Sequence, residues 1–175
     1  MKYIFAIILS FGLKTVVAPS IYDYRLDLID GTTLKLSVLK GKKILFLPIS
    51  GPSPDISYLG YLAQLQTANK NLVIIAVPAM EKENGGKDVD FSPINKSLGS
   101  GILISKPFYT NKSSGGSQKD IFQWLTRKEM NGHFDVDNGL YDFMFIVSET
   151  GNLFAVLPKG VEESVLKNVV VQTGM

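Results

Sequence analysis

Cysteine is absent from the 175-residue sequence, and histidine occurs once. Without a thiol the chain can form no disulfide, cannot attack a substrate through a thiolate and cannot carry a lipid on an N-terminal cysteine. A strong charge of one sign is also absent, because the net charge is +2 and lysine and arginine form no block. The sequence therefore gives no electrostatic reason to expect a nucleic-acid partner or a polybasic attachment to a membrane surface.

A hydrophobic run long enough to span a membrane is missing as well. The opening stretch MKYIFAIILSFGLKTVVAPS begins with Lys2, continues with an apolar run over residues 4–13 and ends in small residues. This is the pattern of a secretory signal peptide. Lys14 ends the run well short of the ~20 residues that a stable membrane span needs. We expect cleavage after Ser20, export to the periplasm or the extracellular space, and one mature domain over residues 21–175. A buried N-terminal strand or helix is the alternative.

The remainder has the composition of one globular domain, with 45% hydrophobic and 19% charged residues. Alternating apolar and polar residues on either side of Asp30 and Gly31 predict a β-hairpin with a two-residue turn. The apolar run in residues 42–49 predicts a strand that is covered on both faces. Asp55 is a plausible N-cap, and the apolar spacing after it predicts a helix of about four turns. A second apolar run at residues 72–78 completes a strand-helix-strand unit, whose two strands must be parallel.

The second half of the chain continues the alternation of strands and helices. We expect, in order, a helical turn at Ser92 and Pro93, a short strand at residues 101–105, a mobile glycine-serine-rich surface loop at residues 109–120, a helix over residues 121–129 capped by Asp120, a hairpin over residues 142–158 and a C-terminal helix over residues 160–172. This order predicts an α/β fold of the thioredoxin-like type. It has a central mixed sheet with helices on both faces, plus the N-terminal β-hairpin.

Three segments resemble the glutathione peroxidase family. The stretch SIYDYRLDLIDGTTLKLSVLKGKKILFL is similar to the opening of the family, with Ser-Ile-Tyr-Asp, Asp-Gly and Gly-Lys in the same order before an apolar strand. NLVIIAVPAMEKENGG is similar to the family segment that leads into a Phe-Pro-Cys-Asn-Gln-Phe-Gly-Gly loop, and FMFIVSETGNLFAVLP to a late Phe-Leu-Val-Asp-x-x-Gly hairpin. The likeness covers most of residues 20–170 and implies a thioredoxin-like fold.

The resemblance also shows what this chain lacks. Family members reduce peroxides with a cysteine or selenocysteine that a glutamine, a tryptophan and an asparagine support by hydrogen bonds. The nucleophile position falls nearest Pro52, the glutamine position on Glu81, and the tryptophan and asparagine positions on Leu140 and Tyr141. None of the four residue types is kept, so the resemblance implies a degenerate member without a catalytic residue. The likeness also predicts that Pro52, Glu81 and Tyr141 converge on one shallow site.

Other residues could in principle carry chemistry. Ser50 or Ser53 would need a general base, and the only candidate is His133, which lies in a glycine-flanked loop that favours simple solvation. Met80 can be oxidised but cannot complete a thiol-type cycle. Asp135, Asp137 and Asn138 stand at the alternating spacing of a calcium loop. Their glycine comes too early and no glutamate closes the loop, so turn chemistry explains them without a metal.

The functional expectation is therefore an exported, non-catalytic binding or interaction protein without a cofactor, whose partner is an unknown protein or small molecule. Two alternatives remain. Some peroxidase or oxidoreductase activity could persist by another route and serve an oxidative-stress response. A protein-interaction surface could lie around Tyr58, Leu59 and Tyr61, and this alternative predicts an exposed apolar patch there.

Overall fold

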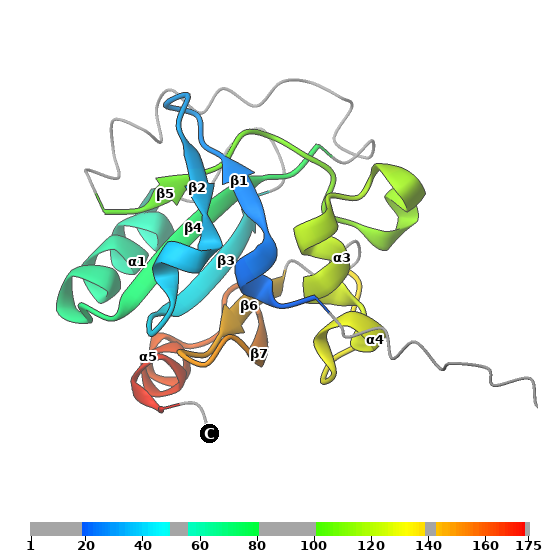
Figure 1. Cartoon of the computed structure of the whole chain (residues 1–175). Coiled ribbons are helices and arrows are strands. Elements are labelled where there is room, and N and C mark those ends of the chain that lie inside the picture. Colours follow the sequence, from blue (N-terminus) through cyan, green and yellow to red (C-terminus); the bar gives the residue numbers. More distant parts are fainter. Residues whose placement is uncertain (1–18, 50–55, 81–100, 139–142, 174–175) are drawn as a thin grey trace, which may run out of the picture.

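The structure is a computed structural model and describes residues 19–49, 56–80, 101–138 and 143–173. A five-stranded sheet with the strand order β5-β4-β3-β6-β7 forms its centre, and β1 and β2 form a separate two-stranded sheet (Figure 1). The strands are β1 (Arg25–Asp27), β2 (Thr33–Lys35), β3 (Lys43–Ile49), β4 (Leu72–Pro78), β5 (Leu103–Ile104), β6 (Phe143–Val147) and β7 (Leu153–Pro158). The helices are α1 (Ile56–Ala68), α3 (Asp120–Thr126), α4 (Lys128–Asn131) and α5 (Glu163–Val171), with 3-10 helices η1 (Ile21–Asp23), η2 (Leu36–Leu39) and η4 (Lys112–Ser117).

The sheet is mixed, as the order of elements predicts. β3 and β4 are parallel and joined through α1, and the short β5 is parallel to β4. β6 runs antiparallel to β3, and β7 runs antiparallel to β6. The predicted strand-helix-strand unit, the late hairpin and the C-terminal helix are therefore confirmed.

Helices cover both faces of this sheet. Successive side chains of a strand point to opposite faces, so Leu45 and Leu47 of β3 join one apolar cluster, and Ile44 and Phe46 join the other. The first cluster is completed by α1 and α5, and the second by α3, η1 and η2. Figure 1 shows α1 and α5 toward one side of the sheet and α3 with α4 toward the other. Both faces of β3 are buried, which explains its unbroken apolar sequence.

The predicted N-terminal hairpin is present, but its connection is longer than two residues. Asp27 lies opposite Thr33, so residues 28–32 join the paired strands. The carboxylate of Asp30 accepts a hydrogen bond from the backbone N–H two residues later, at 2.9 Å, and Gly31 takes the left-handed φ of +88°. These are the usual turn roles of aspartate and glycine, here used in a wider loop.

The segment over residues 109–120, expected to be a mobile surface loop, lies at the surface only in part. Thr110, Asn111 and Gln118 are buried, and η4 lies between them. The side-chain amide of Gln118 donates to the carbonyl of Thr110 at 2.8 Å and to the hydroxyl of Thr126 at 3.1 Å. Buried polar groups are stable only when they are paired in this way, so these polar residues form part of the interior. Composition alone does not separate a paired polar segment from a solvated one.

The helix predicted over residues 121–129 is interrupted. α3 ends at Thr126, Arg127 is extended with φ −114° and ψ 120°, and α4 follows. Lys119 occupies the N-cap position of α3 without a capping side-chain bond, and Asp120 is the first helical residue. The predicted capping role of Asp120 is therefore wrong. Its carboxylate still stands in the first turn, where the helix dipole favours negative charge.

Two further local predictions, the cap at Asp55 and the turn at Ser92 and Pro93, lie outside the described residues. Within the described ranges, no helix has both the length and the apolar character needed to cross a membrane.

Candidate functional site

The four positions that the family resemblance singles out, Pro52, Glu81, Leu140 and Tyr141, lie outside the described residues, as do Ser50 and Ser53. Their convergence on one site stays a prediction. The described side chains that bear on chemistry flank these positions or line hollows elsewhere.

The described residues that lead toward these positions share one end of the sheet. Ile49 ends β3 opposite Pro78, which ends β4, and the backbone N–H of Ala79 donates to the carbonyl of Ile49 at 2.9 Å. β6 begins at Phe143 and runs antiparallel beside β3, so its first residue also lies at the carboxyl end of β3. The carboxamide oxygen of Asn138 accepts from the backbone N–H of Phe143 at 3.1 Å. The three segments are thus held together at their described ends.

The acidic residues considered as calcium ligands are occupied by protein contacts. Asp137 accepts a hydrogen bond from the backbone N–H of Lys112 at 2.9 Å, and Asp135 forms an ion pair with the Lys112 ammonium. The hydrogen bond from the Lys112 ammonium holds the pKa of the Asp135 carboxyl below its ordinary value. Asn138 is buried, and its amide donates to the hydroxyl of Thr110 at 3.2 Å. These side chains connect the segment around η4 to the loop after α4, which is a structural role.

His133 and Met80 are both exposed. His133 follows α4, and its backbone N–H donates to the side-chain oxygen of Asn131 at 2.8 Å. Among the described residues, no carboxylate lies within ion-pair distance of its ring. Met80 is 44% exposed and follows the end of β4. Within the part of the chain that the structure describes, neither residue stands in a catalytic constellation.

The segment around Tyr58, Leu59 and Tyr61 is not an exposed apolar patch. Leu59 is 2% exposed, and both tyrosines are partly buried against the core. The Tyr61 hydroxyl donates to the carbonyl of Glu163 at 3.0 Å, and burial raises the pKa of Tyr58 to about 12. Tyr61 thus fastens α1 to α5, and Tyr58 bonds the sulfur of Met144 in β6. Only Leu59 is wholly buried, so an interaction surface at this place stays a prediction.

Lys43 is a buried cation that no pattern in the sequence singles out. It begins β3, is 1% exposed, and donates from its ammonium to the carbonyls of Val169 at 3.1 Å and Val170 at 3.0 Å, and to that of Gln172. Glu149 lies 3.8 Å away. Burial lowers the pKa of the Lys43 ammonium, and the Glu149 carboxylate opposes this shift. Its contacts are with the end of α5, so its role is to hold that helix on the sheet.

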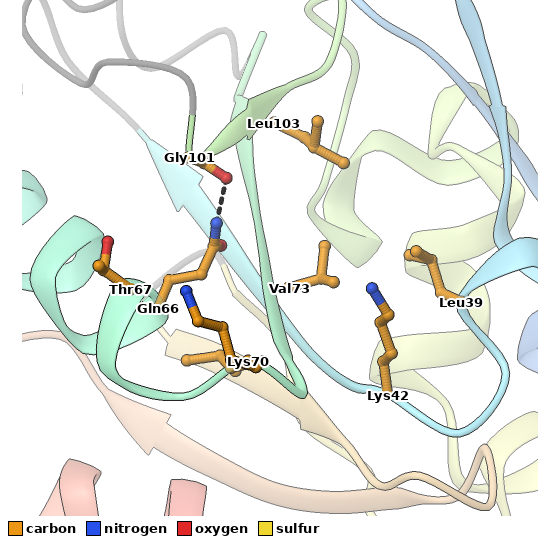
Figure 2. A pocket seen from close by; sticks show the side chains of 9 residues that line it. Leu39, Lys42, Gln66, Thr67, Lys70, Val73, Gly101 and Leu103 are labelled. Atoms are coloured by element: carbon orange, nitrogen blue, oxygen red, sulfur yellow. Dashed lines mark hydrogen bonds between the residues drawn. The ribbon is translucent and has the colours of Figure 1, made fainter.

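A hollow of about 430 Å³ lies at the amino ends of β3 and β4, beside the last turn of α1. It is lined by Leu39, Lys42, Gln66, Thr67, Lys70, Leu72, Val73, Gly101 and Leu103. Figure 2 shows Lys42 and Lys70 on either side of Val73, with Leu103 above it. No pattern in the sequence singles out this set, because its members come from η2, α1, β4, β5 and the connections next to them, and are adjacent only in the fold.

The structure resembles several solved structures at low sequence identity. A crystal structure of Trgpx in its apo form matches with a TM-score of 0.60 and 16% identity, covering 88% of this chain and 95% of that one. T. cruzi GPX1 matches with a TM-score of 0.59 and 12% identity, covering 87% and 95%. A thiol:disulfide interchange protein of the thioredoxin family from Chlorobium tepidum matches at 0.53 and 19%, covering 87% and 92%. The fold is thioredoxin-like.

No family model matches the sequence, and no curated protein matches it either. At these identities the structural likeness shows a shared thioredoxin-like backbone and leaves the chemistry open. What separates this chain from a thiol-dependent relative is visible in its own composition, which contains no cysteine.

Proposed function

We propose that this thioredoxin-like protein is exported and acts by binding a partner or ligand, without peroxidase or thiol-disulfide activity. The absence of cysteine carries the proposal. Reduction of a peroxide on this fold needs a nucleophile that forms a bond to one peroxide oxygen as the O–O bond breaks, and a reductant that then regenerates it. A thiolate or selenolate attacks the peroxide oxygen, and its oxidised product can be reduced again by a thiol. Serine, proline and glutamate side chains do neither at neutral pH.

The contacts inside the fold support a binding role over a catalytic one. The polar side chains examined above, those of Gln118, Asn138 and Asp137, are engaged by other parts of the protein. They hold the frame together, and no nucleophile paired with a base is found among the described residues. The hollow beside α1, by contrast, has two exposed lysines in its lining, Lys42 and Lys70, and neither forms an ion pair with a described carboxylate.

A hydroperoxide assay on the purified protein tests this proposal directly. Protein would be given hydrogen peroxide or cumene hydroperoxide with glutathione, and in parallel with thioredoxin and its reductase, while consumption of NADPH is followed. We expect a rate equal to that of a heat-denatured sample, with an authentic glutathione peroxidase as the positive control. Turnover above the denatured sample would show that peroxidase activity persists and would overturn the proposal.

The start of the described chain bears on where the signal peptide ends. The indole N–H of Trp124 donates to the carbonyl of Pro19 at 2.9 Å, and Ser20 caps η1 in a capping box. Ile21 is fully buried. Cleavage after Ser20 would remove both contacts and place a charged amine on a buried residue. We therefore propose that the exported protein keeps Pro19 and Ser20, with cleavage upstream of them.

Expression of the full sequence in a bacterial host tests both export and the position of cleavage. We expect the protein in the periplasmic or extracellular fraction, with a mass that retains Pro19 and Ser20. A mass for the intact chain together with recovery in the cytoplasmic fraction would contradict export. A mass for a chain beginning at Ile21 would contradict only the position.

A further inference from the structure

The hollow beside α1 exists because β5 covers only part of β4. β5 pairs with Ile75 and Ala76, so no strand among the described residues pairs with the first half of β4 on that side. The side chain of Gln66 takes the place of one. Its oxygen accepts from the backbone N–H of Ile74 at 2.7 Å, and its amide donates to the carbonyl of Gly101 (Figure 2). Gln66 thus bonds the edge of β4 on one side and Gly101 on the other, and the hollow lies beside it.

The floor of this hollow is apolar. Leu72 is 3% exposed and Leu39 is 7% exposed, whereas Val73 and Leu103 are only partly covered. Partly covered branched side chains in a concavity are favourable surface for an apolar group, because each Å² removed from water contributes about 25 cal/mol. The volume of about 430 Å³ is typical of small-molecule sites, which range from about 300 to 1,000 Å³.

The rim of the hollow is cationic. Lys42 and Lys70 both line it, and no aspartate or glutamate does. Among the described residues, no carboxylate lies within 4.0 Å of either ammonium, whereas Lys43 and Lys112 each have one. The Thr67 hydroxyl donates to the carbonyl of Ala63 at 2.9 Å, so its proton is already used within α1. Two ammonium groups that have no counter-ion among the described residues therefore flank an apolar floor.

We propose that this hollow binds a small organic carboxylate with an aliphatic or aromatic body. The carboxylate lies between the ammonium groups of Lys42 and Lys70, and the apolar body lies on Val73 and Leu103. Ammonium-carboxylate hydrogen bonds supply the orientation, and contact with the floor supplies the affinity. This inference deepens the proposed binding function and rests on it. The site stands at the amino ends of the strands, away from the end at which the family positions follow β3 and β4 in the sequence.

The neighbouring hollow of about 360 Å³, lined by Lys43, Lys70 and Glu149 among others, does not share these properties. The Lys43 ammonium is already bonded to carbonyl oxygens of the α5 terminus, and Glu149 contributes negative charge there. An anion would gain less from that hollow. The charge distribution thus favours the Lys42–Lys70 hollow as the carboxylate site.

Octanoate is a suitable probe, with octanol and octylamine as uncharged and cationic controls of the same chain length. Calorimetry and amide chemical-shift mapping would be performed on the mature protein and on the double variant Lys42→Gln/Lys70→Gln. The matched control is Lys35→Gln/Lys128→Gln, which removes the same charge from two exposed lysines outside the hollow. Lys42→Arg/Lys70→Arg keeps both charges and is expected to bind.

We expect octanoate to bind with shifts at Val73 and Leu103, at least tenfold more weakly in Lys42→Gln/Lys70→Gln, and within twofold of wild type in the matched control. Absence of octanoate binding, equal binding of octanol, or an equal loss in the matched control would each overturn the inference. The same preparations would be assayed for hydroperoxide turnover. Failed binding without turnover refutes the carboxylate site alone, whereas turnover refutes the proposed function.

Discussion

The buried ammonium of Lys43 offers the sharpest test of the structure. The last carbonyl groups of any α-helix lack partners within the helix, and a cation near them is also favoured by the helix dipole. In this protein Lys43 supplies the donors, with hydrogen bonds to Val169 and Val170 in the last turn of α5 and to Gln172 after it. Replacement by methionine keeps most of the apolar stem and removes the charge. The substitution therefore isolates the contribution of the ammonium.

The expected loss for Lys43→Met is about 3 kcal/mol of the free energy of unfolding. Charged hydrogen bonds contribute about 1.5–3 kcal/mol each, but the desolvation of the ammonium offsets part of their sum. Loss of one partner of a buried ion pair costs about 3–5 kcal/mol, and the 3.8 Å separation from Glu149 places this pair at the weak end. For a domain of this size about 3 kcal/mol corresponds to a fall in Tm of about 6–12 °C.

Urea unfolding followed by the fluorescence of the single tryptophan, Trp124, measures this loss. Lys42→Met is the matched control, because it makes the same chemical change one residue earlier at an exposed side chain, and it is expected to change stability by less than about 0.5 kcal/mol. Hydrogen exchange adds a local readout, since the amides of α5 should lose protection first. If Lys43→Met is as stable as wild type, the ammonium contributes no net stability and the argument from its carbonyl contacts is refuted.

Two further predictions concern the hairpin turn and the alkaline stability of the fold. Gly151→Ala places a methyl group 2.5 Å from the Tyr22 ring at a φ of +88°, so it should destabilise more than Gly160→Ala, where φ is +79° but nothing lies within 4 Å. The control should cost about 1 kcal/mol in a thermal unfolding assay, and an equal cost for both would contradict the Tyr22 contact. Burial raises the pKa of Tyr58 to about 12 in the folded state, against 10.0 for an unperturbed tyrosine. Between these pH values only the unfolded state releases the proton, so the free energy of unfolding falls as the pH rises through them. Tyr58→Phe should remove this part of the alkaline loss, and a Tyr58 phenolate absorbance that appears near pH 10 would contradict the prediction.

Much of the thioredoxin-like fold could be predicted because it depends on periodicity along the chain. The apolar runs of β3 and β4, the three-and-four spacing of α1 and the late hairpin are local patterns, and local patterns determine the type of element. The errors arose where tertiary contacts overruled composition. Residues 109–120 look like a solvated loop until Gln118 is seen to pair with Thr110 inside the fold.

The absence of thiol chemistry was determined by the sequence alone, because a residue type that is not in the chain cannot be supplied by folding. The candidate binding site was decided only by the tertiary structure. Lys42 and Lys43 are adjacent and chemically identical in the sequence, but Lys43 begins β3 and is buried against α5, whereas Lys42 lies in the turn before the strand, at the rim of a hollow. A one-dimensional pattern gives the face on which a side chain lies, whereas its neighbours, and therefore its chemistry, depend on which distant elements pack against that face.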